Sequence, residues 1–114
     1  MTTTHTLRRP IKAPGLYETE NLSDSEKMVC EHYFVGSADW FVIEYDPIED
    51  ICFGYARILK DCGEYGYFSM KELEEVVISS PINIGGINTS FQSVVERDDY
   101  WHPKAITSVI AELE

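Results

Sequence analysis

The amino-acid sequence predicts an α+β fold: an antiparallel β-meander of about four to five strands with two packed helices. The first indication is a series of β-branched and aromatic runs between residues 28 and 68, separated by short turn sequences. The second is a helix-capping pattern followed by a helical apolar period at residues 69–77. The third is another run of helical period at residues 104–113. Strands that precede helices, rather than alternate with them, are typical of α+β proteins.

Length and composition indicate one globular domain. The chain has 114 residues, of which 44% are hydrophobic and 25% charged, and its formal net charge is −11. We expect residues 1–15 to form a flexible basic N-terminal arm, because prolines and a glycine interrupt any regular period and its charged residues are Arg8, Arg9 and Lys12. Residues 16–114 are then expected to form the single α+β domain.

The first two strands are expected at residues 28–35 and 40–45, with Gly36, Ser37 and Ala38 as the turn between them. Side chains in a strand alternate between two faces. This alternation places Phe41, Ile43 and Tyr45 on one face, and Trp40, Val42 and Glu44 on the other. We expect one of these faces to lie in the core and the other to be partly solvated.

A turn at residues 46–50 leads to a third strand, expected at residues 51–58, and a fourth strand is expected at residues 65–68. Gly54 lies in the middle of the third strand. A glycine at such a position indicates a β-bulge or a bulky neighbour that covers it, and Trp40 is the candidate neighbour.

Ser69 and Glu72 form a capping box, which predicts the start of a helix. Its core-facing stripe would comprise Met70, Leu73, Val76 and Val77. Residues 79–93 are expected to be a long loop, because prolines and glycines are mixed there with polar residues without a steady period. A last strand is expected at residues 92–96. The C-terminal helix at residues 104–113 would bury Ile106, Val109, Ile110 and Leu113.

Residue types that carry catalysis or bind metals lack a recognisable arrangement. Glu44 with Asp46, and Glu96 with Asp98, are carboxylate pairs by spacing, but such pairs also arise by chance in an acidic protein. The histidines, His5, His32 and His102, are too far apart for a spaced ligand motif. The cysteines, Cys30, Cys52 and Cys62, have the irregular spacing of reduced thiols in a cytoplasmic protein. We therefore expect no catalytic residue, no metal and no cofactor.

The charge distribution favours a protein partner with a basic surface. Most acidic residues lie between residues 15 and 75, and their field repels the phosphates of nucleic acids. The sequence also lacks an apolar run long enough for a membrane span, so we expect neither direct nucleic-acid binding nor membrane association. Aromatic residues are common interface anchors, and the candidates are Tyr33, Trp40, Tyr45, Tyr55, Tyr65, Tyr67, Tyr100 and Trp101. The oligomeric state stays open.

Several short strings resemble a family of uncharacterised small proteins encoded on bacterial plasmids, integrative elements and phages. They are Ser37-Ala38-Asp39-Trp40, Glu44-Tyr45-Asp46-Pro47, Phe53-Gly54-Tyr55, Gly66-Tyr67-Phe68-Ser69, Glu72-Leu73-Glu74 and Val95-Glu96-Arg97-Asp98. The resemblance covers roughly residues 15–110, and the segment between Val77 and Val95 departs from the pattern. This family has no established reaction. The resemblance therefore implies a context, an accessory protein of a mobile element, rather than an activity.

Charge and resemblance together predict a non-enzymatic acidic binding protein of a mobile element. It would inhibit or modulate a host defence complex that handles nucleic acids, of the anti-CRISPR or anti-restriction type. The predicted contact residues are Asp39, Trp40, Glu44, Asp46, Glu49, Asp50, Glu96, Asp98, Asp99, Tyr100 and Trp101. One alternative is an interaction module for another mobile-element or regulatory protein, which would depend on Trp40, Trp101 or residues 82–87. Another is an enzyme of unrecognised type that uses Glu44, His32 or Glu96.

Overall fold

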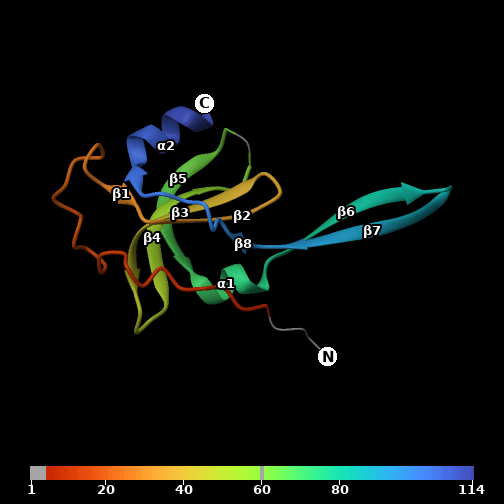
Figure 1. The fold of residues 1–114 in the computed structure, drawn as a ribbon, viewed down its shortest axis with the longest axis horizontal. Coiled ribbons are helices and arrows are strands. Elements are labelled where there is room, and N and C mark those ends of the chain that lie inside the picture. The colour runs from red at the N-terminus through yellow and green to blue at the C-terminus, as the bar shows by residue number, and fades with distance from the viewer. Residues whose placement is uncertain (1–4, 60) are drawn as a thin grey trace.

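The computed structural model of the protein describes residues 5–59 and 61–114 (Figure 1). Its main element is a five-stranded antiparallel sheet in the order β5-β4-β3-β2-β8. These strands are β2 (Glu31–Val35), β3 (Ala38–Asp46), β4 (Ile51–Arg57), β5 (Gly63–Ser69) and β8 (Glu96–Arg97). Two helices, α1 (Met70–Glu75) and α2 (Ile106–Leu113), accompany the sheet. The predicted α+β fold, a meander with two packed helices, is confirmed.

The first predicted strand is divided at Cys30. The short strand β1 (Met28–Val29) pairs with β9 (Lys104–Ala105), which directly precedes α2. The following strand, β2, pairs with β3 on one side and with β8 on the other. The backbone N–H of Cys30 still donates to the Val42 carbonyl at 2.8 Å. β1 therefore leaves the main sheet on the N-terminal side of Cys30 and attaches the C-terminal segment instead.

A β-bulge in β3 decides which side chains share a face of the sheet. The register of β3 and β4 pairs Val42 with Gly54 and then skips Ile43. Beyond the bulge the alternation is inverted, and Tyr45 packs in the same cluster as Val42 rather than with Ile43. The prediction that Tyr45 shares a face with Phe41 and Ile43 is therefore wrong, because a period of two cannot show an inserted residue.

The bulge also explains the glycine in the middle of β4. A Cβ atom at Gly54 would lie 1.8 Å from the carbonyl oxygen of Phe41, so the backbones approach too closely for any side chain there. Of the two predicted explanations for Gly54, the β-bulge is correct, although it lies in β3. Trp40 does not face this position, because it pairs with Ala56.

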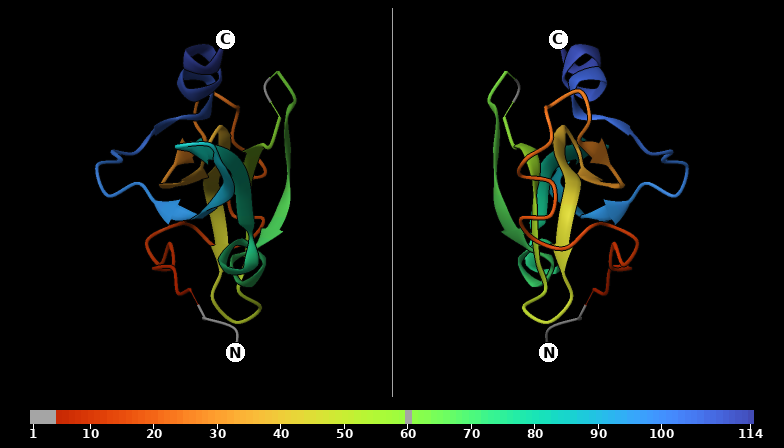
Figure 2. Two further views of the ribbon diagram at one scale, coloured as in Figure 1. Left: turned by 90° about the vertical axis from the view of Figure 1, so that its right-hand side faces the viewer. Right: turned by 90° about the vertical axis from the view of Figure 1, so that its left-hand side faces the viewer.

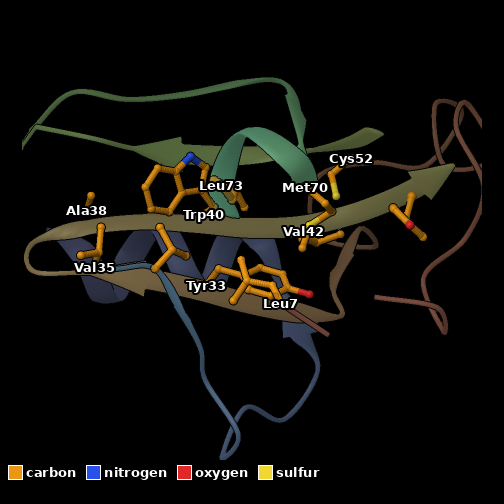
Figure 3. Packing of buried hydrophobic residues seen from close by; sticks show 11 residues of the cluster. Leu7, Tyr33, Val35, Ala38, Trp40, Val42, Cys52, Met70 and Leu73 are labelled. Carbon is orange, nitrogen blue, oxygen red and sulfur yellow. The ribbon is translucent and has the colours of Figure 1, made fainter. Parts of the chain in front are cut away.

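Each face of the sheet carries its own hydrophobic core. The cluster under α1 consists of Leu7, Tyr33, Val35, Ala38, Trp40, Val42, Tyr45, Cys52, Met70, Leu73 and Val95 (Figure 3). The cluster under α2 consists of Val29, Phe41, Ile43, Ile106 and Val109. The two helices thus cover opposite faces of one sheet.

Residues 5–15 pack against the body of the protein, in place of the loosely attached arm that the sequence predicts. Leu7 is only 5% exposed and belongs to the core under α1, and Pro10 is fully buried. Burial of these two apolar residues stabilises the attachment by roughly 2–4 kcal/mol. The remainder of the predicted arm, residues 1–4, lies outside the described residues.

The basic charge of this segment fastens it to acids of the body. The Arg9 guanidinium donates to both carboxylate oxygens of Asp50 at 2.9 Å, and to Glu74 at 2.7 Å. The backbone N–H of Leu7 also donates to Glu74 at 2.7 Å, and that of Tyr45 donates to the Pro14 carbonyl at 2.8 Å. Bidentate pairs of this kind are the stronger ion pairs of proteins. Composition alone does not distinguish a free basic arm from a segment with acidic partners elsewhere in the chain.

The helix α1 begins where predicted and ends earlier. The Ser69 hydroxyl accepts a hydrogen bond from the Glu72 N–H at 3.3 Å, as the capping box requires. Met70 and Leu73 are buried, whereas the helix ends at Glu75. Val77 is therefore not part of its core stripe, and opens a strand instead.

Residues 77–94, predicted mainly as a long loop, form a two-stranded antiparallel hairpin, which we call the β6–β7 ribbon. Its strands are β6 (Val77–Ile84) and β7 (Ile87–Val94), paired along their whole length. The turn between them consists of Gly85 and Gly86, with φ angles of 59° and 86°, which suits a type I′ turn. The ribbon projects away from the sheet (Figures 1 and 2). The loop prediction is wrong because Gly85 and Gly86 form one tight turn rather than an irregular segment, and Pro81 lies within a paired strand.

The C-terminal part follows the prediction with shifted boundaries. The strand expected at residues 92–96 is divided between the end of β7 and β8. The C-terminal helix begins at Ile106 because the two preceding residues pair with β1. Ile106 and Val109 are buried, and Ile110 and Leu113 pack beside them. Within the described residues, neither helix has the length and apolar character needed to cross a membrane.

Candidate functional site

Two of the predicted acidic contact residues meet at one histidine. His32 Nε2 lies 2.8 Å from Asp39 Oδ1, and its Nδ1 lies 3.0 Å from Asp98 Oδ2. The second oxygen of Asp39 accepts from Arg57 Nη2 at 2.8 Å. The imidazole ring stacks on Phe41 with a centroid distance of 4.6 Å. Asp39 and Asp98 therefore lie on either side of one imidazole ring, where they are paired with cations rather than displayed to a partner.

The two carboxylates determine the protonation of His32. A carboxylate only accepts hydrogen bonds, so both ring nitrogens must carry a proton to satisfy Asp39 and Asp98 together. Burial lowers the pKa of His32, but the hydrogen bonds and charges of the two aspartates outweigh it, and the net pKa is raised. In turn, burial raises the pKa of Asp39 and the hydrogen bonds from His32 and Arg57 lower it, with a net lowering. The group is thus an imidazolium between two carboxylates.

This arrangement predicts a stability that falls as the pH rises. Because the folded pKa of His32 is raised, its contribution is complete below its unfolded pKa, about 6.5, and is lost as the pH rises through the higher folded value. We expect the free energy of unfolding to fall as the pH rises above about 6.5, the ordinary pKa of histidine, and His32→Gln to remove this slope. Urea unfolding at a series of pH values measures it. Equal slopes for the two proteins would contradict the ion triad.

Both predicted tryptophan anchors pack inward. Trp40 is 6% exposed and lies in the core under α1 rather than on the surface. Trp101 is partly buried, and its indole N–H donates to the Val29 carbonyl at 2.9 Å. Its ring lies against Phe41, with centroids 5.8 Å apart. Trp101 therefore attaches the segment before β9 to the sheet, while the neighbouring Tyr100 is exposed.

The predicted acids of the turn after β3 lie at the other end of that strand. Asp50 is paired with Arg9, and Asp46 accepts a hydrogen bond from the Ile48 N–H at 2.9 Å within the turn. Glu49 is exposed. Of these three acids, Glu49 alone is exposed to a partner.

The acids around β8 are the more accessible part of the predicted surface. Glu96 and Asp99 are exposed. Arg97 lies between them and donates to Asp99 at 2.8 Å and to Glu31 at 3.0 Å. The turn after β3 lies at the far end of a nine-residue strand from Asp39, so the predicted contact residues of this turn lie apart from those around β8.

Glu44, another predicted contact residue, is buried and orders a loop. Glu44 is only 3% exposed. Its carboxylate accepts hydrogen bonds from the backbone N–H groups of Tyr17 at 2.8 Å and Thr19 at 3.0 Å. The Thr19 hydroxyl is a third donor. Tyr17 has a φ of 69°, in the left-handed region that is strained for this residue type. Glu44 is therefore a positioning residue that holds Tyr17 and the loop of residues 17–26.

That loop completes a row of aromatic side chains on the α2 side of the sheet. Phe53 on β4 faces Tyr67 on β5, with ring centroids 5.2 Å apart, and Tyr55 faces Tyr65 at 5.3 Å. The ring of Tyr17 lies 6.5 Å from that of Tyr67. Tyr17 is 62% exposed, Tyr67 56% and Tyr65 40%. We call these five residues the tyrosine surface.

Acidic side chains border the tyrosine surface. Glu18, Glu20 and Asp24 are exposed on the loop of residues 17–26. Within residues 5–59 and 61–114, they form no ion pair with a basic side chain. Partial burial and the nearby Asp24 carboxylate raise the pKa of Tyr65. Unlike Asp39, Asp50 and Asp98, these loop acids keep their charge available for a partner.

Sequence reasoning located this surface incompletely. Tyr55, Tyr65 and Tyr67 are among the aromatic anchors that composition suggests, but Tyr17 and Phe53 are not. The available signal was the alternation of aromatic residues in two strands expected to pair, because facing strands bring such residues into one row. Tyr17 gave no such signal, since its position depends on the distant carboxylate of Glu44.

Comparison with known proteins identifies the family of the chain. No curated protein and no solved structure shows a significant match to it. A family model described as "Protein of unknown function (DUF2958)" matches residues 3–113, which is nearly the whole chain. The chain therefore belongs to the DUF2958 family.

Proposed function

We propose that the protein is a non-enzymatic binding protein that occupies the basic surface of another protein. The observation that carries this proposal is the tyrosine surface, exposed and bordered by acids without ion pairs in the described part of the chain. Tyrosine supplies a large, stiff contact area and is enriched among the residues that dominate binding energy. The carboxylates at its border select a partner of opposite charge.

Lysine and arginine side chains fit this surface for a second physical reason. The faces of aromatic rings attract cations, with a gain of about 0.5–2 kcal/mol for each well-placed pair. Burial and the nearby Asp24 carboxylate raise the pKa of Tyr65, so a cation that reaches the ring of Tyr65 also approaches Asp24. Ring and carboxylate can therefore hold the same cation together.

More specifically, we propose that the protein belongs to a mobile element and that its partner belongs to a host defence complex in the cytoplasm. A CRISPR or restriction component has a basic groove for nucleic acid, and an acidic protein with net charge −11 competes for such a groove. Support comes from this charge, from the position of the unpaired acids, and from the resemblance of the sequence strings to proteins of plasmids and phages. Inhibition then requires only that the protein occupies the basic groove, without a chemical reaction.

Affinity capture from host lysate tests the proposal. The tagged protein is expected to retain a nucleic-acid-handling protein at low salt and to release it at high salt, since screening weakens contacts between exposed charges. Mass spectrometry identifies the retained protein. If such a protein is not retained at low salt, the proposal is wrong. Retention that persists at high salt would instead favour an interaction module for another kind of partner.

Two matched charge reversals locate the contact. Glu20→Lys with Asp24→Lys changes the net charge from −11 to −7, since each reversal adds two charges. Glu72→Lys with Glu75→Lys makes the same change on α1, which covers the opposite face of the sheet. We expect the first pair to abolish capture and the second to weaken it only slightly. Equal losses would show that net charge, and not the tyrosine surface, determines binding.

A further inference from the structure

The β6–β7 ribbon differs in composition from the rest of the chain. Residues 76–95 contain no Asp, Glu, Lys, Arg or His, although the chain has 20 acidic and 9 basic residues. Every residue of β6 is exposed, and so are the first six of β7. The ribbon extends beyond the body of the protein (Figure 1). A projecting element without charge is not explained by solubility or by attraction to a basic partner.

The register of the ribbon sorts its residues into two unlike faces. Directly paired residues point to the same side, and successive residues alternate. One face therefore carries Ile84 with Ile87, Ile82 with Thr89, Ser80 with Phe91 and Ile78 with Ser93. The other carries mainly Asn83 with Asn88, Pro81 with Ser90 and Ser79 with Gln92. The hydrogen bond from Asn83 Nδ2 to Asn88 Oδ1, at 2.9 Å, agrees with this assignment of the polar face.

The apolar face is exposed along its length. Ile78 is 41% exposed, Ile82 37%, Ile84 64%, Ile87 70% and Phe91 59%. An isolated two-stranded ribbon is marginally stable in water, and contiguous exposed apolar patches mark interaction sites. The apolar face thus requires a cover that the single chain does not provide within its described residues.

We propose that a second copy of this chain covers the apolar face, with two ribbons packed face to face about a two-fold axis. Such an interface is isologous, and an apolar stripe is complementary to itself. The body of each copy carries the whole net charge of −11, so two copies repel each other everywhere except at the uncharged ribbon. Two copies can associate through their projecting, uncharged ribbons while their charged bodies stay apart.

The available area is sufficient for a dimer. Burial of the exposed parts of the five apolar side chains removes on the order of 500 Å² from water for each copy, or roughly 1,000 Å² in total. This value lies at the lower end of specific protein interfaces, and neighbouring polar atoms add to it. The dimer is therefore expected to dissociate on dilution rather than to be permanent.

The edges of the ribbon favour packing by its face. In a two-residue hairpin the pair beside the turn, Ile84 with Ile87, is hydrogen-bonded, and alternate pairs beyond it are not. Pro81 falls in a pair that is not hydrogen-bonded, so its nitrogen points outward on the free edge of β6. Since proline has no N–H, this edge offers an incomplete ladder to an added strand.

Sedimentation velocity over a concentration series tests the proposal on the full chain. The wild type is expected to show a monomer–dimer equilibrium that persists in high salt and becomes tighter there, because salt screens the repulsion between the two bodies. Ile84→Lys is expected to raise the dimer Kd at least about tenfold, since it places a charge in the apolar face. Ser90→Lys, an exposed position on the polar face, makes the same charge change and is expected to leave the dimer intact.

Each other outcome overturns the proposal. A wild type that is monomeric at all concentrations shows that another molecule covers the apolar face. A dimer that resists both Ile84→Lys and Phe91→Lys shows that the copies associate through another surface. Thermal unfolding confirms that both variants keep the fold, as expected for exposed positions on a projecting ribbon. Loss of the dimer in Ile84→Lys or Phe91→Lys is expected to leave salt-sensitive capture of a basic partner unchanged. The dimer and the basic partner are therefore tested independently.

Discussion

Gly54→Ala is expected to destabilise the protein by more than about 4 kcal/mol, at the upper end of the effects of single substitutions. The added methyl group would lie 1.8 Å from the Phe41 carbonyl oxygen and 3.2 Å from the Val42 Cα. Both contacts are with backbone, so no side-chain rotation relieves them. The strands β3 and β4 must separate at the bulge, in the middle of the sheet between the two cores. Thermal unfolding followed by circular dichroism measures the loss.

Gly66→Ala provides the matched control. Gly66 lies directly opposite Gly54 in the register of β4 and β5, and a Cβ there would meet no atom within 4 Å. The substitution is therefore expected to change the free energy of unfolding by less than about 1 kcal/mol, with any gain arising from the less flexible unfolded chain. If the two variants were equally stable, the close approach of β3 at the bulge would be refuted.

Glu44→Gln is expected to cost about 2–4 kcal/mol, because it leaves buried donors without an acceptor. The carboxylate accepts hydrogen bonds from the backbone N–H of Tyr17 and from both the N–H and hydroxyl of Thr19. An amide keeps one oxygen and turns an NH₂ group towards the remaining donors. Chemical unfolding measures the stability, and amide hydrogen exchange of Tyr17 and Thr19 reports the order of the loop.

Glu49→Gln separates this local effect from the loss of one negative charge. Glu49 is exposed in the turn after β3, and its substitution is expected to leave both stability and exchange unchanged. We expect Glu44→Gln also to weaken capture of a basic partner, because Tyr17 and the acids of residues 17–26 lose their fixed position. Normal exchange protection in Glu44→Gln would contradict the positioning role of Glu44.

The sequence allowed the parts of the fold with local causes to be predicted. The turns, the Ser69 cap of α1 and the core stripe of α2 depend on neighbouring residues, and the structure contains all three. Errors concern interactions between distant residues. Arg9 reads as part of a free arm unless Asp50 and Glu74 are known to meet it, and Tyr45 changes face through a bulge that alternation does not reveal.

The same distinction applies to the candidate site. Counting acids in the sequence suggested Asp39, Asp50 and Asp98 as contact residues, but each lies beside a cation from another element. A carboxylate in the sequence gives no sign of whether folding will neutralise it. The aromatic row, in contrast, follows from the alternation of aromatic residues in β4 and in β5 and from the register that pairs these strands. A correct strand pairing is therefore sufficient to predict it.

The composition of the two cores has a consequence for synthesis of the protein in the cell. The core under α1 joins Leu7 to Val95, and the core under α2 joins Val29 to Ile106, so each contains residues that lie far apart in the sequence. The core under α1 cannot close before Val95 has left the ribosome, and the core under α2 cannot close before Ile106 has. Contacts of such long sequence separation are slow to form, on the order of milliseconds to seconds, so the earlier residues of each core are expected to wait for their partners during synthesis.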